Sequence, residues 1–533
     1  MAHDRPAAGA ATIWQVLAER ALATPDGLML VDEHGRRETY ASVLAAAERV
    51  AAGLAECGVE PGSVVSWQLP TRIDTVVLGF ALSRLGVVQN PIIPIYRRRE
   101  VEAMVRQCGA GWLLVPDTFR GFDHATMAKE IAEDVGPGLR TLVLAGELPE
   151  GDPAALPPEP SAPDAVRWIY TTSGTTAAPK GVCHTDAGLV AGGDGLADAL
   201  GVTSEDVGTI FFPVAHIGGP DMLIVSLRAA MPLVIMEAFT PPAAAALMRE
   251  NGVTVSGGST AFYLMFLQEQ QASGPERLVP SLRMLSGGGA PLSAQQYRDV
   301  TEGLGVALVH GFGMTESPMI TSGRYDDDPA DLEATSGRPV LGCEVEIRSA
   351  DGAVLGPEER GQVWIRGSML FQYYLVEGEQ VRPHDEHGWF CTGDLGFRRA
   401  GGHVVLVGRE KDLIIRKGES ISPMEIEEVL AELPAVADVA VIGLADPERG
   451  ERICAVVQLR PGATAPDVLM LRAHCLAAGL APNKSPEQVE VVDQLPKTPT
   501  MKTLKQQLRA RFADDTEDAA PAPPVASGAP ADR

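Results

Sequence analysis

The segment 171–181, TTSGTTAAPKG, combines seven hydroxyl or glycine residues with one lysine in eleven positions. Backbone N–H groups in a glycine-rich turn form a concave anion site, and Ser and Thr hydroxyls add further donors. Lys180 supplies a point charge that suits the terminal phosphates of a nucleotide. The residue types therefore predict a phosphate-binding loop, although a solvated Ser/Thr/Gly surface loop would explain the composition alone equally well.

The order of the residues excludes a Walker-type loop. That motif, G-x-x-x-x-G-K-[ST], places its lysine after the second glycine and a hydroxyl directly after the lysine. Here Lys180 precedes Gly181, and no hydroxyl follows. Because WIY at 168–170 reads as the end of a strand, we expect a strand followed by an anion-binding turn of a different type.

The elements around this loop alternate between helix and strand. Helical and strand-like segments follow one another at 40–58, 63–70, 75–86, 87–95, 99–109 and 112–116. This alternation predicts βαβ units and mostly parallel sheets. Short strands with glycine turns predict a smaller β-rich subdomain at 340–408.

After Arg409 a second series of strand-like and helical segments spans about 100 residues, which predicts a separate α+β domain. We therefore expect an α/β fold with a large N-terminal domain of layered, mostly parallel βαβ sheets, a hinge and a small mobile α+β C-terminal domain. These parts correspond to 1–408, 409–412 and 413–512. The remaining tail, 513–533, is acidic and rich in Pro and Ala, which predicts disorder.

Bulk properties exclude several function classes. The formal net charge of −26 argues against a nucleic-acid-binding or anionic-membrane surface. The seven cysteines form no short CxxC pair, so we expect no zinc site and a reducing, cytoplasmic setting. The N-terminus lacks the apolar core of a signal peptide, and the most apolar long window contains Arg228 at its middle, so we expect no membrane span. A homodimer would be unsurprising.

Seven segments in a fixed order resemble the adenylate-forming superfamily, which includes acyl-CoA synthetases, peptide-synthetase adenylation domains and beetle luciferase. The string T-T-S-G-T-T-x-x-P-K-G resembles the phosphate loop of that superfamily. The other six segments are FFPVAHIGG (211–219), LSGGGAPLS (285–293), HGFGMTES (310–317), WFCTGDLG (389–396), VGREKDLIIRKGESISPMEIEEVL (407–430) and LPKTPTMKTLK (495–505). Each segment alone also fits a turn, a core segment or a charged linker, but their shared order favours the resemblance.

The resemblance implies roles for individual residues. The ATP-binding set would be Thr172, Ser173, Gly174, Thr175, Thr176, Lys180, Gly289, Ala290, Pro291, Gly311, Phe312, Gly313, Met314, Thr315, Asp394, Arg409 and Lys502. The catalytic set would be Lys502, His216, Thr315 and Glu316, with Glu316 as a hard oxygen ligand for Mg²⁺. The acyl pocket would be lined by Ala215, His216, Gly218, Gly287 and Gly288, the CoA channel by Lys417, Gly418 and Glu419, and the hinge would lie at Lys411.

Three positions depart from the family pattern. Ala215 stands where many members have an aromatic residue, which would widen the acid pocket. Phe312 stands where a tyrosine is usual, so it can stack on adenine and loses only the hydroxyl. Met501 stands where the family has glycine before its catalytic lysine, and a positive φ there would cost about 1–2 kcal/mol.

The resemblance implies an ATP-dependent acyl-CoA ligase that uses ATP, Mg²⁺ and CoA. A carboxylate would attack the α-phosphate of ATP to give acyl-AMP and pyrophosphate, and the CoA thiol would then displace AMP after rotation of the C-terminal domain. Because two anions must meet, catalysis would consist mostly of charge neutralisation and positioning. Lys502 would bridge the two anions, and Lys497 and Lys505 are the neighbours that compete for this assignment.

The sequence alone does not identify the carboxylic acid substrate or the acceptor of the acyl group. The small residues of the acyl-pocket segments, and the absence of a cationic counter-charge in them, favour a medium-chain, alicyclic or other bulky apolar acid. The similarity of NPIIPIYRRREVEAMVRQCGA (90–110) to ligases for medium-chain or alicyclic acids points the same way. Two alternatives remain: an adenylating enzyme that passes the acyl group to a separate carrier protein or an amine, and a nucleotide-binding regulator without catalysis.

Overall fold

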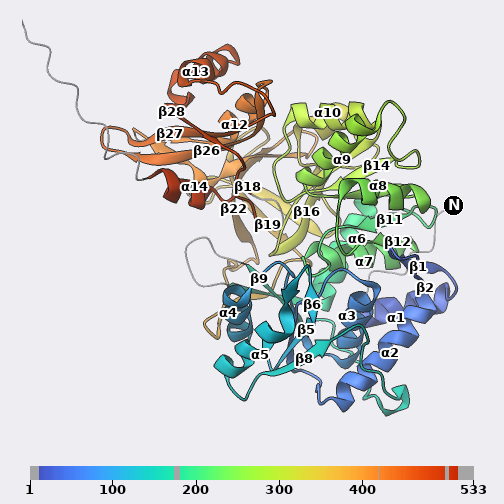
Figure 1. Cartoon of the computed structure of the whole chain (residues 1–533). Coiled ribbons are helices and arrows are strands. Elements are labelled where there is room, and N and C mark those ends of the chain that lie inside the picture. Colours follow the sequence, from blue (N-terminus) through green and yellow to red (C-terminus); the bar gives the residue numbers. More distant parts are fainter. Residues whose placement is uncertain (1–10, 173–179, 418, 499–502, 514–533) are drawn as a thin grey trace, which may run out of the picture. The chain divides into compact units, whose positions relative to one another are not determined.

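The computed structural model describes residues 11–172, 180–417, 419–498 and 503–513 (Figure 1). The chain divides into two compact units, the first ending at Leu406 and the second beginning at Val407. Each unit has hydrophobic clusters of its own. The helices of the first unit are α1 (Ile13–Ala23), α2 (Tyr40–Glu56), α3 (Ile73–Leu85), α4 (Arg98–Cys108), α5 (His124–Val135), α6 (Asp186–Leu200), α7 (Gly218–Ala229), α8 (Pro241–Glu250), α9 (Thr260–Ser273), α10 (Ala294–Leu304) and α11 (Pro329–Ala334).

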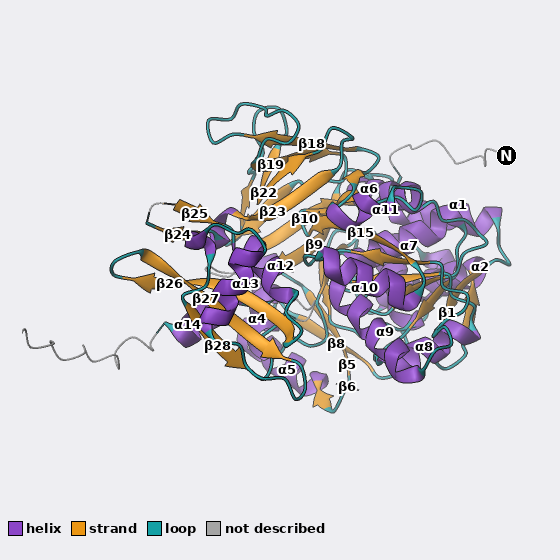
Figure 2. Ribbon diagram, turned by 90° about the horizontal axis from the view of Figure 1, so that it is seen from above, coloured by secondary structure: helices purple, strands orange, loops and turns teal. Residues whose placement is uncertain are grey.

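The largest sheet of the first unit has eight strands in the order β21-β20-β10-β9-β4-β3-β5-β8. Figure 2 labels β10, β9, β5 and β8 of this sheet. Strands β9, β4, β3, β5 and β8 pair in parallel, whereas β10, β20 and β21 extend the sheet by antiparallel pairing. The bounds are β3 (Val64–Trp67), β4 (Val88–Pro91), β5 (Trp112–Pro116), β8 (Arg140–Leu144), β9 (Val166–Thr172), β10 (Lys180–Thr185), β20 (Tyr373–Val376) and β21 (Glu379–Val381).

At β5 and β9 both faces of this sheet are buried. Successive side chains of a strand point to opposite faces, so neighbouring residues pack in different clusters. Leu113 of β5 and Ile169 of β9 pack in one cluster with helices α4 and α5. Leu114 and Tyr170, the next residues along the same strands, pack in the main cluster with α2, α3 and α6. A parallel sheet covered by helices on both faces is the arrangement that the alternation of elements predicts, and the α/β class is confirmed.

Two further sheets complete the helix-covered part of the first unit. One has the order β11-β12-β1-β2, and the other has the order β13-β14-β15-β16-β17, with parallel pairing up to β15 and antiparallel pairing beyond it. The bounds are β1 (Leu28–Val31), β2 (Arg37–Thr39), β11 (Gly208–Ile210), β12 (Leu233–Ile235), β13 (Val255–Gly258), β14 (Met284–Gly287), β15 (Ala307–Met314), β16 (Ser317–Ser322) and β17 (Arg338–Pro339), and a small hairpin joins β6 (Thr118–Phe119) and β7 (Phe122–Asp123).

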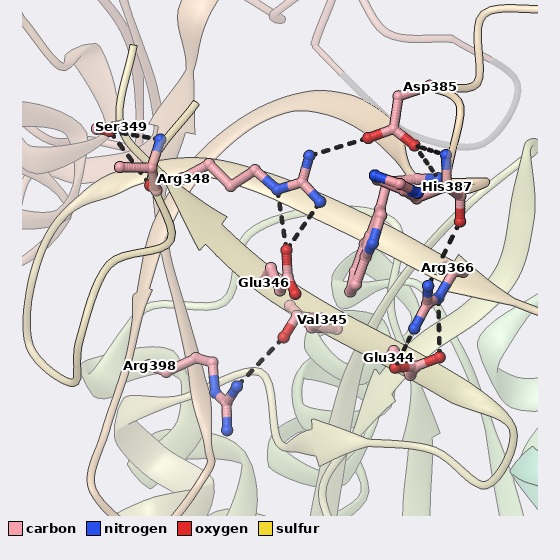
Figure 3. Close-up of polar contacts among 11 residues, drawn as sticks. Glu344, Val345, Glu346, Arg348, Ser349, Arg366, Asp385, His387 and Arg398 are labelled. Atoms are coloured by element: carbon pink, nitrogen blue, oxygen red, sulfur yellow. Dashed lines mark hydrogen bonds and ion pairs between the residues drawn. The ribbon is translucent and has the colours of Figure 1, made fainter. Parts of the chain in front are cut away.

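The β-rich part of the first unit is a four-stranded sheet of β18 (Cys343–Arg348), β19 (Gly361–Gly367), β22 (Phe390–Arg398) and β23 (Val404–Arg409). Strand β23 continues past Leu406, so its last three residues are counted with the second unit. On its surface Arg348 pairs with Glu346 and Asp385, and Arg366 pairs with Glu344 (Figure 3). Within the predicted β-rich subdomain at 340–408, β20 and β21 pair with β10 instead of joining this sheet. A long-range pairing of this kind has no signal in the local pattern of short strands.

The second unit is a sheet of five strands with helices on both faces. Val441 and Ile453 pack in one cluster with α12 and α13, whereas Ile442 and Cys454 pack in another with α14. The elements are β24 (Ile414–Arg416), β25 (Glu419–Ile421), α12 (Pro423–Ala431), β26 (Val436–Asp446), β27 (Gly450–Leu459), α13 (Val468–Ala477), β28 (Gln488–Val492) and α14 (Lys505–Phe512). Among the helices of the described residues in either unit, none has the length and apolar character needed to cross a bilayer.

Candidate active site

Strands β9 and β10 carry the two ends of the predicted phosphate loop. Thr172 ends β9, and Lys180 begins β10 opposite it. The Lys180 side chain is exposed, and its Nζ lies 5.0 Å from the centroid of the Tyr374 ring, within the range of a cation–π contact. The loop residues Ser173, Gly174, Thr175 and Thr176 lie outside the described residues.

A buried asparagine fixes the strand from which this loop leaves the sheet. Nδ2 of Asn90 donates to the Ile169 carbonyl at 2.7 Å and to Oγ1 of Thr171 at 3.2 Å. Its Oδ1 accepts a hydrogen bond from Ser66 at 2.9 Å. The amide therefore connects β3, β4 and β9 at the point where the predicted phosphate loop begins. This role could not be predicted from the sequence, because a single Asn in a strand gives no functional signal.

A histidine of β10 holds the turn that contains Thr315. Nε2 of the buried His184 lies 2.7 Å from the Thr315 carbonyl oxygen, and it must be the donor because a carbonyl only accepts. Burial lowers the pKa of His184 to about 4, so the ring is neutral at physiological pH. This contact brings the predicted α-phosphate residue to the same face of β10 as the core residue Val182.

The next residue, Glu316, is held at both its backbone and its side chain. The Phe371 N–H donates to the Glu316 carbonyl at 2.9 Å, and the Tyr374 hydroxyl donates to Oε1 of Glu316 at 2.7 Å. Burial, and to a smaller degree the charge of Glu316, raise the pKa of Tyr374, so the phenol remains a donor. The structure therefore brings together three predicted site residues, Lys180, Thr315 and Glu316, through two residues that the motifs did not include, His184 and Tyr374.

The predicted glycine-rich segments lie where strands approach each other too closely for side chains. A Cβ on Gly287 would come within 1.8 Å of the Gly258 carbonyl oxygen, and one on Gly288 within 2.4 Å of the Gly311 carbonyl oxygen. Gly289 has φ +81°, in the left-handed region that favours glycine. Close approach of β14 to β13 at Gly287, and of the following Gly288 to β15, explains these two glycines. The predicted roles of this segment beside adenine and the acyl group stay predictions.

Several predicted adenine and phosphate residues belong to β15 and the segment before α10. Phe312 is 7% exposed and packs in the main core cluster, so its stacking role stays a prediction. The carbonyl oxygens of Ala290 and Pro291 accept hydrogen bonds from Thr260 at 3.2 and 3.1 Å. A Cβ on Gly313 would come within 2.1 Å of the Pro318 carbonyl oxygen, and Met314 ends β15.

The predicted acyl segment leads into α7. Nδ1 of His216 accepts a hydrogen bond from the Gly218 N–H at 3.2 Å, and the Phe212 ring meets its imidazole edge-on. Ala215 is 2% exposed and packs in the main core cluster. These contacts fix the segment, while its role in binding the acid stays a prediction.

The later motifs lie on β22, on β23 and in the second unit. Asp394 of β22 is buried, and its N–H donates to Oγ1 of Thr392 at 3.0 Å. Arg409 ends β23, and the exposed Lys411 follows in a short 3-10 turn. Lys417 has φ +51°, and its N–H donates to the Arg449 carbonyl at 2.7 Å.

The remaining predicted site residues belong to the second unit or are not among the residues that the structure describes. Glu419 accepts a hydrogen bond from Asn483. The two lysines that compete with Lys502 both form ion pairs, Lys497 with Asp438 at 2.6 Å and Lys505 with Glu427 at 2.7 Å. Gly418, Met501 and Lys502 lie outside the described residues.

The comparison with protein families agrees with this arrangement. The model of the AMP-binding enzyme family matches residues 17–375. The chain belongs to this family. The model of the AMP-binding enzyme C-terminal domain matches residues 425–502. The predicted membership of the adenylate-forming superfamily is therefore confirmed.

Curated relatives of the chain activate carboxylic acids. A 2-hydroxy-7-methoxy-5-methyl-1-naphthoate–CoA ligase of Streptomyces carzinostaticus is 32% identical, with 93% of this chain and 92% of the relative covered. A salicyl-AMP ligase / salicyl-S-ArCP synthetase of Mycobacterium tuberculosis is 32% identical, with 93% and 89% covered. Among solved structures, the o-succinylbenzoate coenzyme A synthetase of Bacillus subtilis in complex with ATP and magnesium ion has a TM-score of 0.80 at 27% identity, covering 93% of this chain and 99% of that one.

These findings establish the enzyme class. The AMP-binding enzyme is an adenylate-forming, AMP-forming acid–thiol ligase, and the alternative of a regulator without catalysis is set aside. ATP is its nucleotide.

Proposed function

We propose that this enzyme converts a carboxylic acid and ATP to acyl-AMP and pyrophosphate, and then transfers the acyl group to the thiol of CoA with release of AMP. The observation that carries the proposal is the set of contacts joining Lys180, Thr315 and Glu316 in one unit. A cation, a hydroxyl and a carboxylate are the groups that a magnesium nucleotide requires.

The residues present suit a Mg²⁺ ion that enters with the nucleotide. Among the described residues, no three or more His, Cys, Asp or Glu side chains are grouped so that they could hold a metal ion. Mg²⁺ in nucleotide sites commonly uses one or two carboxylates together with phosphate oxygens, and Glu316 supplies one such carboxylate. When bound, the ion would offset the charge that develops between the carboxylate and the phosphates.

The chain's own residues would supply the remaining charge neutralisation and positioning. Lys180 would hold the β- and γ-phosphates, and the Thr315 hydroxyl would bind the α-phosphate. Lys502 would neutralise the acid carboxylate and the α-phosphate as they approach, and Lys411 would be the hinge between 1–408 and 413–512. The ion pairs of Lys497 and Lys505 support the choice of Lys502 as the catalytic lysine.

The proposed acid is bulky and apolar, of the medium-chain, alicyclic or ring-bearing kind. The segments 211–219 and 285–293 contain no Lys or Arg that could pair with a second carboxylate. The naphthoate ligase among the relatives acts on a large fused-ring acid, which supports the same class.

A carrier-protein thiol is the second candidate acceptor. It is favoured by the 32% identity to a salicyl-S-ArCP synthetase, whose name includes the carrier-bound product.

A panel of carboxylic acids tests the proposal. Each acid is incubated with ATP and Mg²⁺, with and without CoA, and the release of AMP and pyrophosphate is measured together with the thioester mass. We expect bulky apolar acids to give a CoA thioester. Pyrophosphate release without a CoA thioester would favour the carrier protein, and the absence of pyrophosphate release with every acid would contradict the proposed reaction.

A further inference from the structure

Tyr374 contacts two of the residues proposed to bind the magnesium nucleotide. Its hydroxyl donates to Oε1 of Glu316 at 2.7 Å, and its ring lies beneath Nζ of Lys180 at 5.0 Å. The neighbouring Phe371 holds this ring at a centroid distance of 4.6 Å and also donates its N–H to the Glu316 carbonyl. One short segment of chain therefore fixes the metal-binding carboxylate and the phosphate-binding ammonium together.

The hydrogen bond also determines which carboxylate oxygen is available for a metal. Oε1 of Glu316 accepts the proton of the phenol. Within the part of the chain that the structure describes, no donor bonds to Oε2. Because Mg²⁺ commonly takes a single oxygen from a carboxylate, an anchored Oε1 and an available Oε2 form an arrangement suited to the ion.

We propose that Tyr374 is a positioning residue, which orients Glu316 toward Mg²⁺ through its hydroxyl and supports Lys180 through its ring. This inference depends on the proposed function, since it assumes that Glu316 and Lys180 bind the magnesium nucleotide.

The chain offers a matched control in the adjacent tyrosine. Tyr373 and Tyr374 are consecutive on β20, so their side chains point to opposite faces of the sheet. Tyr374 packs against the main cluster, and Tyr373 packs against the cluster of α4 and α5. Tyr373→Phe therefore removes a hydroxyl from the same strand without affecting Glu316 or Lys180.

The test is the Mg²⁺ dependence of ATP binding, measured as the rise in unfolding temperature while Mg²⁺ is titrated at fixed ATP. For Tyr374→Phe we expect the half-maximal Mg²⁺ concentration to rise by about ten-fold, because a hydrogen bond to a charged group is lost. Tyr374→Leu also removes the ring beneath Lys180 and should in addition weaken ATP binding. Tyr373→Phe should match the wild type, and the unfolding temperatures without ligand show whether any variant is simply less stable.

The variant Glu316→Gln distinguishes the proposed metal-binding role of Glu316 from the proposed positioning role of Tyr374. If it leaves the Mg²⁺ dependence unchanged, the metal role of Glu316 in the proposed function fails, and the role of Tyr374 fails with it. If Glu316→Gln shifts the dependence and Tyr374→Phe does not, only the role of Tyr374 is overturned. The double variant should behave as Glu316→Gln alone, since the phenol acts through that carboxylate, and additive effects would overturn the inference.

Discussion

At the scale of single residues, His184 is a buried group outside the predicted motifs that contacts a predicted site residue. Its Nε2 is the donor to the Thr315 carbonyl, 2.7 Å away, and the imidazole is fully enclosed. Replacing it by alanine removes a buried hydrogen bond, which costs about 1–3 kcal/mol of folding free energy. We expect His184→Ala to raise the KM for ATP more than it lowers kcat, and His184→Gln, which can keep a donor, to recover part of the loss.

The same residue gives a pH dependence with a definite sign. Burial lowers the pKa of His184 from 6.5 to about 4 in the folded chain. Between those values the unfolded chain binds the extra proton and the folded chain does not, so the free energy of unfolding decreases as pH falls from about 6.5 toward 4. Denaturant unfolding at pH 7.5 and 5.0 measures this decrease, which should be smaller in His184→Gln. If the free energy of unfolding decreases equally in the wild type and in His184→Gln, His184 is not the group responsible for the pH dependence.

At the scale of elements, Asp186 connects α6 to two other elements. It is the first residue of α6, its Oδ1 accepts from Nε1 of Trp168 at 2.8 Å, and its Oδ2 accepts from the N–H of Ile13 at 3.3 Å. The carboxyl therefore joins β9, which leads to the phosphate loop, to the start of α1. Burial raises its pKa from 3.8 to about 6, so the ionised form is costly in the folded state.

This cost predicts a stability change opposite in sign to that of His184. The folded chain holds the Asp186 proton up to about pH 6, whereas the unfolded chain releases it near 4, so the contribution present below pH 4 is lost as pH rises through 6. Relative to the wild type, Asp186→Asn should gain about 2 kcal/mol on going from pH 4.5 to 7.5. Unfolding curves at both pH values test this, with Asp299→Asn on the exposed face of α10 as the control. If the difference in free energy of unfolding between Asp186→Asn and the wild type is the same at both pH values, the prediction is wrong.

The sequence predicted elements well where the signal is local. The helical periodicity at 40–58 and the strand predicted at 112–116 correspond closely to α2 and β5. Burial of one or both faces of an element requires apolar residues at regular short spacings, which can be recognised in the sequence. The pairing of β20 with β10 was missed, because it joins segments far apart in the chain. Asn90, His184 and Tyr374 were missed for the same reason: each acts on a motif residue through a long-range contact, and a lone polar or aromatic residue in a strand reads as core.

At the scale of the whole molecule, the chain consists of two compact units, and the proposed reaction has two half-reactions. We assign Lys502, which follows β28 in the sequence, to the first half-reaction only. Lys502→Ala should therefore abolish adenylate formation, measured as pyrophosphate release, because the repulsion between the two anions is no longer offset. Formation of the thioester from a supplied acyl adenylate and CoA should survive.

The neighbouring lysine makes this prediction specific. Lys505 is the first residue of α14, and its ammonium forms an ion pair with Glu427 of α12 at 2.7 Å. Its charge is therefore neutralised by a carboxylate of the second unit. Lys505→Ala removes the same charge three positions away and should cost about 1–3 kcal/mol of stability, because both partners of its ion pair are mostly buried, while leaving both half-reactions intact. Equal loss of the two half-reactions in Lys502→Ala would place the lysine in general folding or nucleotide binding. Loss of adenylation in Lys505→Ala alone would move the catalytic assignment to α14.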